Sequence, residues 1–175
     1  MSILQSALVM RILIAGVGNV LRGDDGFGVA VAQALSQNGS LPDEVTVFEG
    51  GIAGIPLLHE LMDGYDALIV ADAIERGGAP GTIYVIEPDI TYPTMLDPTV
   101  LHSSLADAHY TDPSKVLVLA KALGVLPPKI FVVGCQPAGF DELGAELSDE
   151  VRAAVQVALR QIESLIETLK HQETA

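Results

Sequence analysis

The sequence predicts an α/β domain built around a mostly parallel β-sheet. Short apolar runs alternate along the chain with segments of helical periodicity, which is the pattern of βαβ units. The run at 67–73 (ALIVADA) is almost wholly apolar, as expected of a strand buried on both faces of a parallel sheet. Because 49% of the 175 residues are hydrophobic, the chain can bury a sizeable core, and we expect residues 1–175 to form a single domain.

The first half of the chain supplies three predicted strands and two predicted helices. In chain order they are strand 11–15, helix 25–37, strand 45–49, helix 55–62 and strand 67–73. A glycine-rich segment, 16–28 (GVGNVLRGDDGFG), lies where the first strand gives way to the first helix. This layout of strand, glycine-rich turn and helix is typical of α/β proteins that bind a ligand at the first turn.

The fourth predicted strand, 82–87, runs antiparallel to the others or lies at an edge. Only the turn 75–81 (ERGGAPG) separates it from the strand before it, whereas a parallel neighbour needs a crossover of about a dozen residues or more. Residues 88–111 follow and are irregular, being rich in Pro, Thr, Asp and His. The next helix is expected to have Asp112 as its N-cap and Pro113 as its first residue.

The C-terminal part of the chain contains one more strand and a long helix. We expect the helix that begins at Pro113 to stop at Gly124, where glycine is the preferred C-terminal residue. Strand 129–134 follows, and Ser148 then opens a long amphipathic helix. Both ends of the chain are expected to lie outside the domain: residues 1–9 as a dispensable extension and residues 171–175 as a frayed tail.

Composition excludes several classes of partner. The formal charge is −14, with only nine Lys and Arg, so nucleic acid and anionic membrane surfaces are poor partners. No uncharged apolar stretch is long enough to span a membrane. The N-terminus lacks the basic region of a signal peptide. A single cysteine excludes an internal disulfide and fits a reducing compartment, so a cytoplasmic protein is expected.

The glycine-rich turn resembles a dinucleotide-binding fingerprint but departs from it. Leu21 stands where GxGxxG requires its third glycine. Asp24 and Asp25 lie at the start of the helix, where the helix dipole favours carboxylates and where the same carboxylates would repel a pyrophosphate. Glu49 at the end of the second strand could still mimic the acid that binds a ribose. The alternative is that both Asp residues are helix caps, and we expect Asp24 to cap and Asp25 to project.

Asp72 ends the apolar third strand, and a buried carboxylate there needs a partner. One interpretation is that loop N–H groups satisfy it. The other is a metal ion shared with Asp25, because parallel strands present their carboxyl ends at one edge of the sheet. Two carboxylates and an imidazole suit a borderline cation such as nickel or zinc.

The chain offers four histidines and one thiol to such a site. His59 lies in a short amphipathic helix and His171 in the expected tail, whereas His102 and His109 both lie in the irregular segment. Sequence patterns typical of serine hydrolases, zinc proteases or cysteine-rich metal sites are absent. Cys135 follows a predicted strand with no visible base nearby, so we expect a small buried hydrophobic residue.

Four segments together resemble the [NiFe]-hydrogenase maturation endopeptidases. They are GVGNVLRGDDGFGV (16–29), EGGIAGIPLL (49–58), LIVADAI (68–74) and DAHYTDPSKVLVLAKALG (107–124). The resemblance runs from about Arg11 to the C-terminal helix. It implies a twisted five-stranded sheet with one antiparallel strand and helices on both faces. It also implies an endopeptidase that removes the C-terminal extension of the hydrogenase large-subunit precursor after nickel insertion.

Carried over by position, the family's acidic and histidine ligands fall on Asp25, Asp72 and His109. The family often has Glu at the first of these positions, so the shorter Asp25 changes the reach by one methylene. The resemblance implies that the nickel is carried by the precursor, and zinc or cadmium are further cations that suit the same ligands. Hydrolysis through a metal-polarised carbonyl or metal-bound water, and water activation of the aspartic type, both stay open.

Two other functions also stay open from the sequence. A nucleotide-binding oxidoreductase would use the glycine-rich turn for its cofactor, and a non-catalytic nickel chaperone would bind the metal without cutting the precursor.

Overall fold

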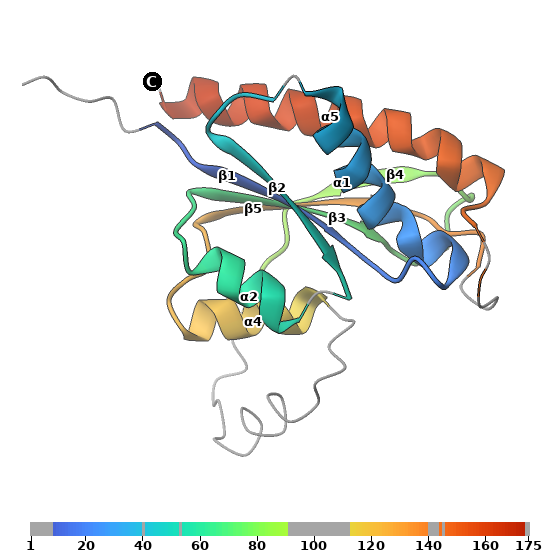
Figure 1. Cartoon of the computed structure of the whole chain (residues 1–175), viewed down its shortest axis with the longest axis horizontal. Helices are drawn as coiled ribbons and strands as arrows, with labels where there is room; N and C mark the ends of the chain where they lie inside the picture. The colour runs from blue at the N-terminus through green and yellow to red at the C-terminus, as the bar shows by residue number, and fades with distance from the viewer. Residues whose placement is uncertain are drawn as a thin grey trace, which may run out of the picture.

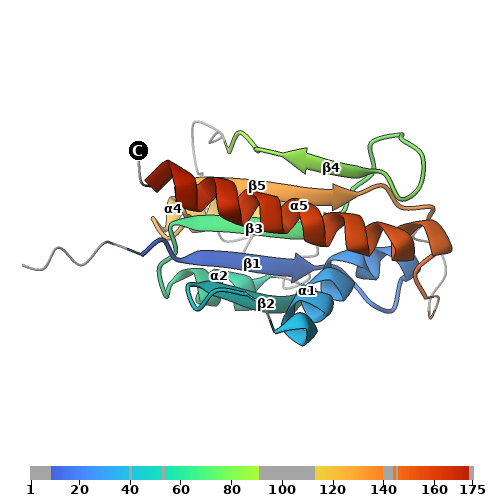
Figure 2. The same ribbon diagram turned by 90° about the horizontal axis from the view of Figure 1, so that it is seen from above.

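A five-stranded sheet lies between two layers of helices in the computed structural model (Figures 1 and 2). The structure describes residues 9–39, 41–52, 54–90, 113–139, 144 and 146–173. The predicted α/β fold class is confirmed, including the mostly parallel sheet and its one antiparallel strand.

The strands follow the predicted apolar runs closely. They are β1 (Ile12–Val17), β2 (Val45–Gly51), β3 (Ala67–Ala73), β4 (Ile83–Ile86) and β5 (Lys129–Cys135). Their order in the sheet is β2-β1-β3-β5-β4. β1 lies inside the sheet and is buried along its whole length, as is most of β3, which explains why these two runs are almost free of polar residues.

β4 is the antiparallel strand, as its short connection to β3 predicts. Ile83 pairs with Cys135 and Ile86 with Val132, so β4 begins beside the end of β5 and runs back along it. The other strand pairs, β1 with β2, β1 with β3 and β3 with β5, are all parallel. The carboxyl ends of β1, β2, β3 and β5 therefore meet at one edge of the sheet, which we call the carboxyl edge.

Helices cover the two faces in pairs. They are η1 (Gly23–Gly26, a short 3-10 turn), α1 (Phe27–Asn38), α2 (Ile55–Leu61), α4 (Pro113–Ala122) and α5 (Asp149–Glu173). α1 and α5 contribute to one hydrophobic core cluster with the sheet, and α2 and α4 contribute to the other (Figure 1). As predicted, Pro113 is the first residue of α4.

Two predicted boundaries are wrong. The first helix does not begin at Asp25, because residues 23–26 form η1 and the α-helix starts at Phe27. Residues 171–173 do not fray, because α5 continues through Glu173. Contacts hold the end of this helix to the sheet layer: Lys129 Nζ donates to Gln172 Oε1 at 3.1 Å, and Lys170 pairs with Glu44.

None of the helices in the described part of the chain is both long enough and apolar enough to cross a membrane.

Candidate active site

Close packing of α1 brings the glycine-rich turn over the carboxyl edge. A Cβ atom on Gly28 would come within 2.1 Å of the Ala71 carbonyl oxygen on β3 and 2.2 Å of the Val17 oxygen on β1. A Cβ on Gly16 would meet the Gly28 oxygen at 2.2 Å. Only glycine fits at both positions, so the start of α1 lies directly on the ends of these two strands. Gly28 thus provides the close packing of helix on strand that the third glycine of GxGxxG, replaced here by Leu21, would provide in a dinucleotide-binding turn.

The same packing places the two predicted acids at one edge. Asp25 lies in η1, which contacts β3. Asp72 is the next-to-last residue of β3 and pairs with Gly134 of β5. Both acids are half-buried. The elements that carry the two acids, η1 and β3, are therefore in contact at the carboxyl edge.

The turn between β1 and η1 is not an open phosphate cradle. Several of its amide groups bond within the protein: Gly18 N–H to the Gly51 oxygen, Asn19 N–H to the Asp25 oxygen and Arg22 N–H to the Asn19 oxygen. The amides of Leu21 and Asp25 are also bonded, to Asn19 Oδ1 and to the Arg22 oxygen. A phosphate site needs such N–H groups to be available, so the geometry disfavours a dinucleotide.

Asp24 does not cap the first helix, which corrects the prediction. Neither η1 nor α1 has a side-chain cap hydrogen bond. The Asp24 side chain instead accepts three hydrogen bonds from the C-terminal third of the chain: from the Ala138 and Ser148 N–H groups, each at 2.7 Å, and from Ser148 Oγ at 3.0 Å. Asp24 is 3% exposed, so it is a buried carboxylate that links η1 to the C-terminal third of the chain and not a helix cap at the surface.

Cys135 is fully buried at the end of β5, as predicted. Burial, and to a smaller extent the nearby Asp24 carboxylate, raise the pKa of its thiol to about 11. A nucleophilic cysteine needs the thiolate at neutral pH, so this environment argues against a thiol mechanism.

Gln136 is a residue of this region that the sequence did not reveal. It is 3% exposed, and its side-chain oxygen accepts hydrogen bonds from Arg76 N–H at 2.8 Å and Gly78 N–H at 3.2 Å. Its amide nitrogen donates to Glu75 Oε1 at 2.7 Å. The hydrogen bond to Gln136 lowers the pKa of the exposed Glu75 carboxyl. The only sequence signal is a polar residue directly after a buried strand.

The predicted third ligand, His109, lies outside the described residues, and so does His102. His59 and His171 are exposed on α2 and α5. Within the described ranges no three His, Cys, Asp or Glu side chains form a group that could hold a metal ion. The metal-ligand set of Asp25, Asp72 and His109 accordingly stays a prediction.

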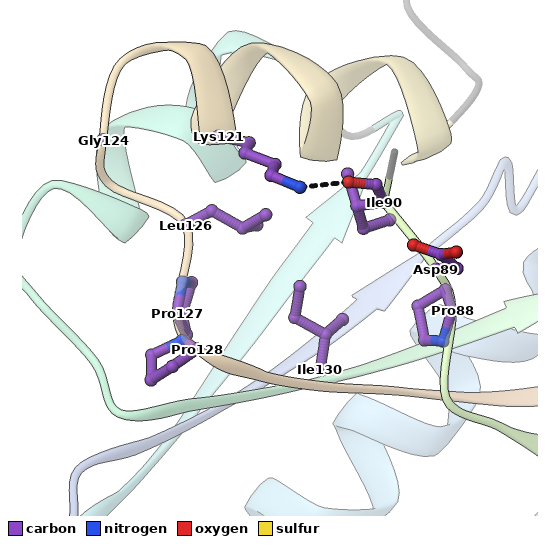
Figure 3. Close-up of a pocket in the computed structure, with 9 residues that line it drawn as sticks. All are labelled: Pro88, Asp89, Ile90, Lys121, Gly124, Leu126, Pro127, Pro128 and Ile130. Atoms are coloured by element: carbon purple, nitrogen blue, oxygen red, sulfur yellow. Dashed lines mark hydrogen bonds between the residues drawn. The ribbon is translucent and has the colours of Figure 1, made fainter. Parts of the chain in front are cut away.

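A cavity of about 320 Å³ opens at the other end of β5, away from the acids (Figure 3). Pro88 and Ile90, which follow β4, line one side, and Leu126 and Pro128 line the other. Lys121 of α4 reaches into it and donates a hydrogen bond to the Ile90 carbonyl oxygen. Neither Asp25 nor Asp72 borders this cavity, so it is separate from the acidic site.

The fold and this edge define a class: an α/β protein with acids at the carboxyl ends of its strands, no open phosphate cradle and no ionised cysteine. Comparison with known proteins makes the class specific. A family model described as hydrogenase maturation protease matches residues 29–165. The chain belongs to the hydrogenase maturation protease family and is a peptidase.

Individual relatives agree with this assignment. The hydrogenase expression/formation protein HupM of Azotobacter chroococcum mcd 1 is 37% identical over 149 residues, which cover 85% of this chain and 68% of the relative. The hydrogenase 2 maturation protease of Escherichia coli K12 is 35% identical over 155 residues, covering 87% and 88%.

Solved structures give the same answer for the fold. The hydrogenase maturating endopeptidase HybD from E. coli superposes with a TM-score of 0.71 at 33% identity, covering 91% of this chain and 94% of its own. The [NiFe] hydrogenase maturation protease HybD from Thermococcus kodakarensis gives a TM-score of 0.67 at 29% identity, covering 89% and 99%.

Proposed function

We propose that this peptidase removes the C-terminal extension of a [NiFe]-hydrogenase large-subunit precursor after nickel has been inserted. In this proposal Asp25, Asp72 and His109 bind the nickel that the precursor carries. The metal is thus part of the substrate, and its capture brings the scissile peptide bond to the carboxyl edge. A cytoplasmic site of action is part of the same proposal and is supported by the single, unpaired cysteine.

The observation that carries the proposal is the placement of two half-buried acids by closely packed elements. Asp25 is held by η1 and Asp72 by β3, and Gly28 fixes the helix that follows η1 against β3. Carboxylates held on rigid elements can bind a cation without reorganising first. A turn in which several amide groups are already bonded favours a cation over a phosphate as the ligand.

The position of α4 supports His109 as the third ligand. α4 runs back along the sheet (Figure 1). Lys121, near its end, donates a hydrogen bond to the Ile90 carbonyl oxygen beside the start of β5 (Figure 3). Its first residue, Pro113, therefore lies toward the carboxyl edge. His109 precedes Pro113 by four residues, so at most about 14 Å of chain between Cα atoms joins it to the start of α4.

Two hydrolytic routes fit this arrangement. The bound metal can polarise the scissile carbonyl or supply an activated water, or one carboxylate can accept a proton from the attacking water. In both routes the acids act on a peptide bond held beside the nickel. Replacing nickel in the precursor by a metal of different Lewis acidity separates them, because only the first route then changes its rate at saturating substrate.

The proposal is tested by incubating the protein with nickel-loaded and nickel-free precursor and following the shortening of the precursor on a gel. We expect the loaded form to be cut and the nickel-free form to stay intact. Asp25→Asn should slow cleavage by at least about 100-fold, because it removes one preorganised charge. Glu49→Gln is the matched control, since Glu49 is an exposed acid at the neighbouring end of β2.

Equal cleavage of both precursor forms would contradict the nickel-sensing part of the proposal. Tight association with the loaded precursor without any cleavage would instead identify a nickel chaperone. Full activity of Asp25→Asn would remove this residue from the ligand set.

A further inference from the structure

The segment Cys135–Ala138 begins with the last residue of β5 and is hydrogen-bonded both to η1 and to the chain that follows β3, the two elements that carry the acids. One of those elements is η1, with Asp25. The other is the end of β3, with Asp72. Among the residues that the structure describes, Asp24 and Gln136 are the buried polar or charged side chains, and each connects this segment to one of the two elements.

Asp24 makes the connection on the η1 side. It is the immediate neighbour of Asp25, and its Oδ2 accepts a hydrogen bond from the Ala138 N–H at 2.7 Å. The two Ser148 groups, N–H at 2.7 Å and Oγ at 3.0 Å, complete its set of donors. Hydrogen bonds to a buried carboxylate are short and strong, and losing one leaves a buried donor or acceptor unpaired.

Gln136 makes the connection on the β3 side. Its side chain bonds with Glu75, Arg76 and Gly78, in the turn that begins three residues after Asp72. Its backbone is fixed as well, because its N–H donates to the Thr82 oxygen at 2.9 Å. The turn after β3 is therefore hydrogen-bonded to the segment Cys135–Ala138, which also donates a hydrogen bond to Asp24.

Both connections end on one short piece of chain. Ala138 is two residues from Gln136, and Pro137 between them restricts the backbone. A movement of η1 relative to the end of β3 must therefore break hydrogen bonds of Asp24 or of Gln136. Neither side chain reaches the carboxyl edge as a ligand, since both are buried and already bonded to protein groups.

We propose that Asp24 and Gln136 are positioning residues, which set the separation of Asp25 and Asp72 through the segment Cys135–Ala138. The proposal rests on the proposed function, because the two acids are taken to hold the nickel of the precursor. It adds a specific reason why the first acid of the pair in GDDG is present although it is not a ligand.

The test compares Asp24→Asn and Gln136→Met with the wild-type chain in single-turnover cleavage of nickel-loaded precursor. Saturating enzyme gives the rate of the bound complex, and its concentration dependence gives the affinity separately. We expect the saturating rate per folded molecule to fall about 10- to 100-fold in each variant, as for residues that orient metal ligands. Circular dichroism at a temperature well below Tm checks that the variants are folded.

A merely structural role predicts a different result: Tm falls, but the rate per folded molecule stays at the wild-type value. The double variant adds a second distinction. If both residues act on the separation of Asp25 and Asp72, the fold-loss of cleavage rate in the double variant should be smaller than the product of the fold-losses in the two single variants. Glu146→Gln is the control, because it breaks only the exposed ion pair with Arg152 in the same region.

Ser148→Ala covers the case in which Asp24→Asn fails to fold. It removes one of the three hydrogen bonds of Asp24 and should give a smaller loss of rate, a few-fold, in a folded protein. Wild-type rates in folded Gln136→Met and Ser148→Ala, with a wild-type chain that cuts, would overturn the positioning role alone. A wild-type chain that does not cut the loaded precursor would overturn the proposed function and this inference with it.

Discussion

The substitution Gly28→Ala should disable the site without touching an acid. The new methyl carbon would lie 2.1 Å from the Ala71 oxygen and 2.2 Å from the Val17 oxygen, about 1 Å closer than such atoms approach one another. Both oxygens belong to the backbone of buried strands, so no side chain can rotate away. The start of α1, with η1 and Asp25 ahead of it, must therefore move by about 1 Å, a displacement that can cost about 100-fold in rate.

The stability of the variant follows from two opposing terms. Alanine in place of glycine inside a helix contributes about 1 kcal/mol. Overpacking costs about 1–3 kcal/mol, and the upper end applies here because two backbone atoms are in the way. The net loss of about 2 kcal/mol corresponds to a fall in Tm of about 4–8 °C for a chain of this size.

The assay pairs thermal unfolding with cleavage of nickel-loaded precursor at a temperature where the variant is folded. Gly139→Ala is the control, because a Cβ there meets no atom within 4 Å and its φ is not positive. A Gly28→Ala protein with the Tm and the cleavage rate of the wild type would refute the argument that this close contact positions η1.

Two further predictions concern residues that the resemblance separates. Cys135→Ala should keep processing activity. Iodoacetamide should alkylate the native thiol slowly at pH 8, and the rate should rise as the pH approaches the raised pKa of about 11. Rapid alkylation at pH 8, or a folded variant that cannot cut the precursor, would restore a thiol mechanism. His109→Ala should abolish processing and weaken metal binding, whereas His102→Ala should keep most activity. The reason is that, of these two histidines, His109 alone has the family's spacing to Val116 and Leu117. The reverse order of activities, measured on folded variants with the same precursor, would place the third ligand on His102.

Much of the fold could be predicted because its causes are local. A strand buried on both faces requires an apolar run such as 67–73, and the short turn 75–81 allows only an antiparallel or edge placement for the strand after it. The place of Asp72 at the carboxyl edge follows from parallel strands, and that of Asp25 from the turn that joins the first strand to the first helix. These inferences need only the order of the elements and the lengths of the connections between them.

The role of Asp24 could not be predicted, because its partners are remote in sequence. Ala138 is 114 residues away and Ser148 is 124 residues away, and no periodic pattern carries information over such a distance. Local rules favour a cap for an Asp at a helix start, and tertiary hydrogen bonds override that preference here. Gln136 was missed for the same reason, since its partners lie about 60 residues earlier in the chain.

The long-range hydrogen bonds of Asp24 also set the time at which the enzyme can become active during its synthesis. β1, η1 and α1 leave the ribosome early, but the carboxylate of Asp24 lacks all three of its hydrogen-bond donors until residue 138 has emerged, and it lacks the two from Ser148 until residue 148 has emerged. A carboxylate without partners keeps its water and resists burial. The acidic edge is therefore completed only with the C-terminal third of the chain, and a nascent fragment that ends before α5 should be unable to act on a precursor made beside it.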